Sequence, residues 1–166
     1  INADKLSEAA ADIGAANGIA LPLDVRDRSQ WDEALASFAR ASGGRLDILV
    51  NNAGIVRYGW IEEFSEDDLD QSIAINIKGT INGVRAGLEL LKATSGSTLV
   101  NIASVASLRG NPKYSIYSAS KFAVRGLTQS LDLELSRFGI RTVCIMPWSI
   151  ETPLLDGSAA TGDMTM

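Results

Sequence analysis

The sequence predicts an α/β fold in which a parallel β-sheet is doubly wound by helices. Three observations favour this class. Short apolar runs alternate with segments of helical periodicity, polar residues follow directly after the runs, and no internal repeat or low-complexity tract breaks the alternation. With 166 residues, of which 46% are hydrophobic and 21% are charged, the chain is predicted to form one domain over residues 1–166.

Four apolar runs are predicted to be parallel strands, because each is short and apolar enough to be buried in the middle of a sheet. They span residues 18–24, 46–51, 98–102 and 141–147. Cys144 lies in the last run and is the only cysteine of the chain, so it forms no intrachain disulfide. It is interpreted as a small buried strand residue in a protein of a reducing compartment.

Helical patterns fill the intervals between these runs. Their apolar positions are Trp31, Leu35 and Phe38, then Ile77, Ile81, Val84, Leu88 and Leu91, and finally Val124, Leu127, Leu131 and Leu135. Ser29 with Asp32, and Ser65 with Asp68, have the spacing of a capping box and are predicted to begin helices. Strand and helix in alternation indicate a parallel sheet with helices on both faces.

Composition excludes several classes of function. The formal net charge is −5 and no cluster of lysine or arginine exists, which argues against a nucleic-acid surface. No apolar stretch approaches the roughly 18 residues of a membrane span. The chain has no histidine, which removes Ser-His-Asp hydrolysis and nearly all histidine-containing metal sites, so no metal is expected. We expect a cytoplasmic protein that acts on a small molecule.

Polar groups with the potential for chemistry occur at four places. They are Asn51-Asn52-Ala53-Gly54 after a strand, Asn76 at a predicted helix start, Ser104 after the next strand, and Tyr117-Ser-Ala-Ser-Lys121 at the opening of a helix. The spacing of four puts Tyr117 and Lys121 on one helix face, close enough for the ammonium to favour a phenolate. Lowering the pKa of a tyrosine from about 10 to about 7 takes roughly 4 kcal/mol of phenolate stabilisation.

In this order and spacing, the motifs resemble the classical short-chain dehydrogenase/reductase family over about residues 24–152. The resemblance implies a Rossmann-type fold and an oxidoreductase that moves a hydride between NAD or NADP and a secondary alcohol or ketone. It implies that Tyr117 is the general acid and base, that Lys121 also hydrogen-bonds the nicotinamide ribose, and that Ser104 polarises the carbonyl. Asn76 stands where the family holds a water in a proton relay.

The resemblance also implies a set of cofactor-binding positions. They are Asp24, Val25, Asn52, Ala53, Gly54, Tyr117, Lys121, Pro147, Ile150 and Thr152. Asp24 is implied to contact the adenine amino group, Gly54 to let the backbone approach the adenine ribose, and Ile150 and Thr152 to hold the carboxamide. Trp148 replaces the glycine that usually follows this proline in the family. It is therefore expected at the substrate site with Ser104 and Tyr117.

Parts of the family pattern have no counterpart here. The first strand, the glycine-rich pyrophosphate loop and the second strand are expected upstream of Ile1, and further elements after Met166, so the natural protein is expected to be longer. The residue that distinguishes NAD from NADP ends the second strand, so cofactor choice is not predicted. The resemblance further implies a homo-dimer or homo-tetramer that packs through the helices over 77–91 and 117–135.

Each feature also has an interpretation that does not involve catalysis. Tyr117 alone is also typical of a helix-start aromatic, Ser104 of a turn, Asn76 of a helix cap and Asp24 of a turn former. Trp148 could pack outward rather than face the substrate. For the whole protein, the alternatives are a catalytically silent relative used for binding or scaffolding, and an extended-type nucleotide-sugar epimerase.

Overall fold

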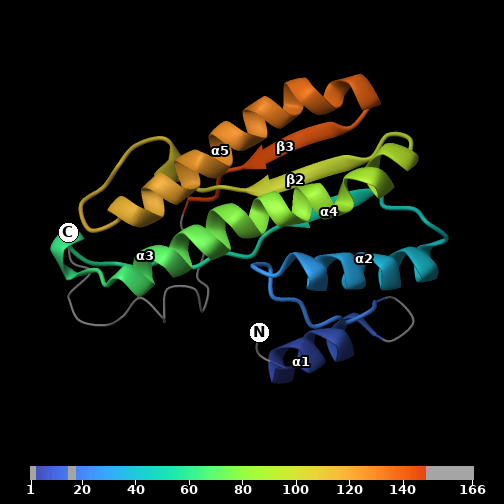
Figure 1. Ribbon diagram of the computed structural model, residues 1–166, viewed down its shortest axis with the longest axis horizontal. Helices are drawn as coiled ribbons and strands as arrows, with labels where there is room; N and C mark the ends of the chain where they lie inside the picture. Colours follow the sequence, from blue (N-terminus) through green and yellow to red (C-terminus); the bar gives the residue numbers. More distant parts are fainter. Residues whose placement is uncertain (1–2, 15–17, 149–166) are drawn as a thin grey trace.

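Helices and strands alternate in the computed structural model, which describes residues 3–14 and 18–148 (Figure 1). The α-helices are α1 Ala3–Ile13, α2 Arg28–Ser42, α3 Glu66–Ser72, α4 Thr80–Ala93 and α5 Ser115–Leu135. The strands are β1 Ile48–Asn51, β2 Thr98–Ile102 and β3 Arg141–Ile145. A π-helix, Ile73–Gly79, joins α3 to α4, and short 3-10 helices span Ile61–Glu63, Val105–Ser107 and Ser136–Phe138.

The three strands form a parallel sheet in the order β1-β2-β3. In its register Leu49 lies opposite Leu99, and Leu99 lies opposite Thr142. This arrangement confirms three of the four predicted strands and the parallel α/β class. Because the strands run in one direction, their carboxyl ends meet at one edge of the sheet, which is where open α/β sheets bind ligands.

The fourth predicted strand, residues 18–24, is wrong for the described structure, where this segment has no regular secondary structure. A strand requires a hydrogen-bonded neighbour, and in the described residues the edge of β1 facing away from β2 has none. The end of the segment is held by local bonds instead. The Asp24 N–H donates to Gln30 Oε1 at 2.8 Å, and the Asp24 carbonyl accepts from the Asp27 N–H at 3.0 Å.

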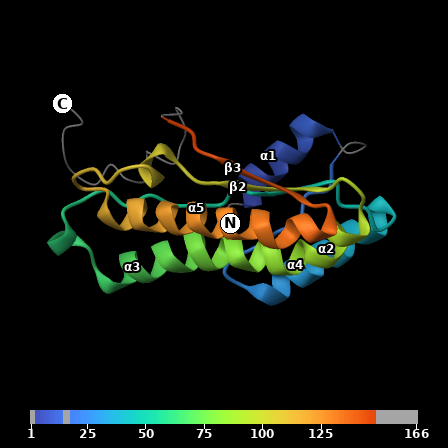
Figure 2. The ribbon, with the colours of Figure 1, turned by 90° about the horizontal axis from the view of Figure 1, so that it is seen from above.

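Helices α2, α4 and α5 lie on one side of the sheet, and α1 lies on the other (Figure 2). Between the sheet and the three helices is a core of buried apolar side chains: Trp31, Leu46, Leu49, Val84, Leu91, Leu99, Leu131, Leu135 and Ile140. Successive strand residues point to opposite faces, so Ile48 and Val50 of β1 point away from this core. They remain 60% and 50% exposed. None of the helices in 3–14 and 18–148 has the length and apolarity for a membrane crossing.

Two glycines explain how closely α4 approaches β1. A Cβ on Gly83 would lie 2.1 Å from Asn51 Oδ1, and one on Gly87 would lie 2.6 Å from a methyl carbon of Leu49. Neither distance is tolerated between heavy atoms that are not bonded. The helix therefore packs on the strand through its glycines, which brings the end of β1 next to the residues of the helical segment 73–93.

The helix starts agree only in part with the sequence analysis. Ser65 caps α3 as predicted, because its hydroxyl accepts from the Asp68 N–H and the Asp68 carboxylate accepts from the Ser65 N–H. The predicted cap at Ser29 is wrong. Asp27 caps α2 with a carboxylate that accepts from the Ser29 N–H at 2.8 Å, and the Ser29 hydroxyl also donates to it at 2.7 Å.

Asn76 is not at a helix start, which corrects a second prediction. It lies inside the π-helix Ile73–Gly79, so helical backbone runs without a break from Glu66 to Ala93. A π-helix widens the turn and is found most often at functional sites. Here it places the Asn76 side chain toward the loop after β1 and toward α5, which the contacts below establish.

Candidate active site

The polar residues picked out by the sequence converge at the carboxyl end of the sheet. Ser104 follows β2, Gly54 follows β1, Tyr117 and Lys121 come from the first two turns of α5, and Asn76 comes from the π-helix. Of these five, all but Tyr117 and Gly54 are buried, with Asn76 1%, Lys121 5% and Ser104 7% exposed. Residues separated by up to 67 positions in the chain thus share one site.

Ser104 is fixed by the short helix that follows it. Its hydroxyl accepts from the Ala106 N–H at 3.1 Å, which caps the 3-10 helix Val105–Ser107. Its carbonyl accepts from the Ser107 hydroxyl. Burial raises the pKa of Tyr117, and Ser104 has a smaller opposing effect. Ser104 is therefore near the Tyr117 phenol.

Burial raises the pKa of Tyr117 in the described side chains, and a lowering of this pKa by Lys121 together with a bound nicotinamide stays a prediction. The Lys121 Nζ lies 5.8 Å from the centroid of the Tyr117 ring and donates to the Ile102 carbonyl at 2.9 Å. Its ammonium thus points at the end of β2. Burial also lowers the pKa of Lys121 from 10.5 to about 8, with a smaller opposing effect of Cys144. A lysine that is partly neutral stabilises a phenolate less than a permanent cation does.

The amide of Asn76 holds the loop that follows β1. Its Oδ1 accepts from the Ile55 N–H at 2.8 Å, and its Nδ2 donates to the Ile55 carbonyl at 2.9 Å and to Ser120 Oγ at 3.0 Å. Both hydrogens of the amide nitrogen and one lone pair of its oxygen are therefore used within the protein. The Asn76 backbone carbonyl accepts from the Thr80 hydroxyl at 2.9 Å. Asn76 is a positioning residue in this structure, and the water of the proton relay stays a prediction.

Ser120 is a member of the site that the sequence analysis missed. Its hydroxyl donates to the Tyr117 carbonyl at 2.7 Å and accepts from Asn76 Nδ2, and the residue is 2% exposed. It connects the π-helix to the turn of α5 that carries Tyr117. The only sequence signal is a small hydroxyl residue three positions after Tyr117, which is too common to stand out.

The loop after β1 leaves its backbone open to a ligand. Asn52 and Ala53 are exposed at the end of the strand. A Cβ on Gly54 would lie 3.3 Å from Asn76 Oδ1 and 3.4 Å from Lys121 Nζ, so a side chain at this position would crowd both groups. This tight contact places the backbone of Gly54 beside Lys121, in agreement with a shared role of the two at a cofactor.

Asp24 and Val25 are already engaged within the protein. The Asp24 carboxylate accepts from Arg26 Nε at 2.9 Å and pairs with its guanidinium, which lowers the pKa of Asp24 to about 2. The Val25 carbonyl accepts from Trp31 Nε1 at 3.2 Å and from Asn82 Nδ2 at 3.1 Å. The Val25 side chain lines a cavity, described next, whereas a contact of Asp24 with adenine stays a prediction.

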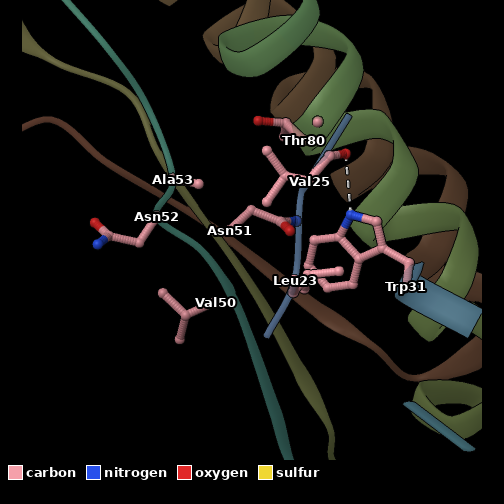
Figure 3. Close-up of a pocket in the computed structure, with 9 residues that line it drawn as sticks. Leu23, Val25, Trp31, Val50, Asn51, Asn52, Ala53 and Thr80 are labelled. Carbon is pink, nitrogen blue, oxygen red and sulfur yellow. Dashed lines mark hydrogen bonds between the residues drawn. The ribbon is translucent and has the colours of Figure 1, made fainter. Parts of the chain in front are cut away.

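A cavity of about 190 Å³ separates the Leu23–Val25 segment from β1 (Figure 3). It is lined by Leu23, Val25, Trp31, Val50, Asn51, Asn52, Ala53, Gly79 and Thr80. Asn51 points into the space between β1 and Trp31, while Val50 and Asn52 point the other way (Figure 3). The Asn51 amide donates to Asn101 Oδ1 at 2.9 Å, but its own Oδ1 is buried without a partner.

The segment after β3 is described only to Trp148. The Pro147 carbonyl accepts from the Val105 N–H at 3.1 Å, so this segment runs beside the one that carries Ser104. The Trp148 side chain is 77% exposed, and its position at the substrate stays a prediction. Ile150 and Thr152, the predicted carboxamide contacts, lie outside the described residues. The described part of the chain holds no cluster of acidic or cysteine side chains suited to a metal ion.

Comparisons with known proteins identify the family. A protein-family model described as short chain dehydrogenase matches residues 1–162. The chain is 40% identical over 134 residues to 3-alpha-(or 20-beta)-hydroxysteroid dehydrogenase of Mycobacterium bovis, which covers 81% of this chain and 51% of that protein. It is 36% identical over 145 residues to trans-4-hydroxycyclohexanecarboxylate dehydrogenase of Sinomonas cyclohexanicum, with coverage of 87% and 55%.

A similar solved structure is that of gluconate 5-dehydrogenase from Burkholderia cenocepacia in complex with NADP and tartrate. Its TM-score is 0.83 at 31% identity, over 96% of this chain and 63% of that chain. The chain therefore belongs to the short-chain dehydrogenase family and has its Rossmann-type α/β fold, as the resemblance implied. It spans about half the length of the curated relatives it matches.

Proposed function

We propose that the protein is an NAD- or NADP-dependent oxidoreductase that interconverts a secondary alcohol and a ketone, with Tyr117 as the general acid and base. The observation that supports this most is the gathering of Ser104, Tyr117 and Lys121 at the carboxyl end of the sheet, with Lys121 Nζ 5.8 Å from the centroid of the Tyr117 ring. Family membership and the NADP-bound neighbour agree with it. The choice between NAD and NADP stays open.

The residues after β1 and Lys121 fit a nicotinamide cofactor. The exposed backbone at Asn52 and Ala53 and the glycine at 54 leave room for a ribose next to Lys121 Nζ. The buried ammonium of Lys121 has three hydrogens, of which one goes to the Ile102 carbonyl, so donors remain for ribose hydroxyls. When bound, the nicotinamide ring supplies or accepts the hydride, which is the chemistry that amino-acid side chains lack.

The protein's own contribution to the reaction is proton transfer and orientation. In reduction, the Tyr117 hydroxyl donates its proton to the substrate oxygen while the Ser104 hydroxyl donates a second hydrogen bond to that oxygen; in oxidation, Tyr117 accepts the proton. Burial raises the pKa of Tyr117, so the phenol is protonated and ready to donate in the ligand-free protein. Burial lowers the pKa of Lys121 to about 8, so this lysine can release its proton close to neutral pH.

We further propose that the protein is cytoplasmic and a homo-oligomer that packs through α4 and α5. Phe122 and Leu133 on α5 are 44% and 79% exposed, which supports an apolar contact on this helix. Light scattering of the full-length protein at micromolar concentration should report a dimer or tetramer. A monomer would contradict the oligomer proposal without affecting the proposed reaction.

The proposed reaction is tested with the full-length protein and a panel of cyclic and acyclic secondary alcohols and ketones. The expected result is a change in the near-ultraviolet absorbance of the reduced nicotinamide with at least one pair of substrate and cofactor. Cofactor binding without turnover of any alcohol or ketone would favour the silent relative. Turnover of a nucleotide sugar with no net change in reduced cofactor would favour the epimerase.

A further inference from the structure

Lys113 has a backbone conformation that lysine rarely adopts. Its φ is +64°, and it is the only residue other than glycine with a positive φ in the described part of the chain. The turn Asn111–Tyr114 is closed by a hydrogen bond from the Tyr114 N–H to the Asn111 carbonyl at 3.2 Å, with Pro112 ahead of Lys113. Glycine or asparagine is usual at such a position, because a side chain there costs about 1–2 kcal/mol.

The side chain of Lys113 lies across two aromatic rings of another loop. Its Nζ is 5.1 Å from the centroid of Tyr58 and 5.3 Å from that of Trp60. The Lys113 carbonyl also accepts from the Gly59 N–H at 3.1 Å, which joins the loops after β1 and β2. No carboxylate pairs with Lys113 among the described residues. The carboxylate of Glu63 accepts from the Trp60 N–H at 2.7 Å instead.

A row of aromatic rings leads from this ammonium to the catalytic phenol. The rings of Tyr58 and Tyr114 meet edge to face with centroids 5.0 Å apart, and those of Tyr114 and Tyr117 are 6.2 Å apart. Burial raises the pKa of Tyr114, so this ring is uncharged at neutral pH. The row of half-buried rings ends at Tyr117 on one side and at the Lys113 ammonium on the other.

We propose that Tyr58, Tyr114 and Lys113 form a substrate subsite for a hydroxy or keto acid that carries a ring. The ring packs on the tyrosines, and the ammonium of Lys113 pairs with the carboxylate at the far end of the substrate. The lysine ammonium is a compact point charge, so it pairs with a carboxylate without needing a two-pronged geometry. The subsite deepens the proposed function and rests on it.

The first test compares two ketones that differ only in charge, 4-oxocyclohexanecarboxylate and its neutral carboxamide. For the full-length enzyme with its cofactor, the expected kcat/KM is about two- to fivefold higher for the carboxylate, the value of one partly exposed ion pair. Lys113→Met should remove this preference by lowering kcat/KM for the carboxylate alone, and Lys113→Arg should keep it. Lys113→Gly relaxes the turn and should lose the preference as Lys113→Met does.

A purely structural role for Lys113 gives a different pattern. In that case Lys113→Met lowers kcat/KM for both ketones equally, and the proposal is overturned. It is also overturned if the unchanged enzyme turns over both ketones but does not prefer the carboxylate. Either result leaves the proposed hydride transfer intact, because activity itself is still observed.

A binding measurement keeps the subsite testable if neither ketone is turned over. Cyclohexanecarboxylate is titrated calorimetrically into the full-length protein with saturating cofactor, and cyclohexanecarboxamide serves as the neutral control. The expected Kd for the carboxylate rises about two- to fivefold in Lys113→Met and is unchanged in Lys113→Arg. No binding, or an equal Kd in Lys113→Met, rejects the subsite. Failure of the proposed function would instead appear as no turnover of any alcohol or ketone.

Discussion

Lys121 is a buried amine whose charged form the fold makes unfavourable. It is 5% exposed, and its Nζ has one hydrogen-bond acceptor, the Ile102 carbonyl at 2.9 Å. Replacing it by methionine keeps the length and the packing of the side chain and removes the charge. Comparing the free energy of unfolding of the unchanged protein and of Lys121→Met at several pH values isolates the effect of burying the ammonium on stability.

The magnitude follows from the pKa of Lys121, which burial lowers from 10.5 to about 8. At about 1.36 kcal/mol for each pKa unit, this corresponds to roughly 3 kcal/mol. The sign follows from proton binding. Between pH 8 and 10.5 the unfolded chain keeps the lysine proton that the folded protein has released, so the free energy of unfolding of the unchanged protein rises with pH. Lys121→Met lacks this increase.

The assay is urea unfolding of both full-length proteins from neutral pH to about pH 10.5, read by circular dichroism. The stability advantage of Lys121→Met over the unchanged protein should shrink by roughly 3 kcal/mol across this range, and other groups that titrate cancel in the difference. Two curves that stay parallel over the whole range would refute the reasoning, because they would show that the pKa of Lys121 is the same in the folded and unfolded states.

Three further predictions concern packing and positioning. Gly83→Ala should lower the free energy of unfolding by about 1–3 kcal/mol, since its Cβ would collide with Asn51 Oδ1; an unchanged free energy in urea unfolding would contradict the packing of α4 on β1. Ser120→Ala should lower stability by about 1–3 kcal/mol, because an Asn76 amide hydrogen loses its partner, and should lower kcat with little change in cofactor KM. An unchanged kcat would leave Ser120 with a structural role only. Trp148→Gly should leave the ratio of kcat/KM for a bulky and a small ketone within about twofold, because its side chain is exposed, and a larger change would place it at the substrate.

The sheet could be predicted from the sequence wherever a strand has its neighbours. The runs at 46–51, 98–102 and 141–147 contain β1, β2 and β3, since apolar runs of that length fit the centre of a parallel sheet. The run at 18–24 is also short and mostly apolar but has no partner in the described residues, and an apolar run alone does not reveal whether a neighbouring strand is present. The cap at Asp27 was missed for a related reason, because the spacing of Ser29 and Asp32 fits a capping box equally well.

The candidate site was predictable where a motif fixes it. Tyr117, Lys121 and Ser104 converge as their spacing indicates, and Gly54 lies beside Lys121. Contacts between residues that are far apart in the sequence could not be predicted from the local spacing of motifs. Asn76, in the π-helix, forms hydrogen bonds with Ile55, which is 21 positions away in the sequence, and with Ser120, which is 44 positions away. The direction of the Lys121 ammonium depends on the Ile102 carbonyl, 19 positions away, in the same way.

The most direct test of proton transfer by Tyr117 is the Tyr117→Phe variant of the full-length protein, which removes one oxygen and keeps the ring. Turnover is followed by the absorbance of the reduced nicotinamide, and the cofactor Kd by the fluorescence of the reduced cofactor. The account predicts that kcat falls by about 10²–10⁴, the usual contribution of a general acid, while the cofactor Kd changes by less than about twofold. A variant that keeps most of its kcat would contradict the assignment of Tyr117 as the proton donor.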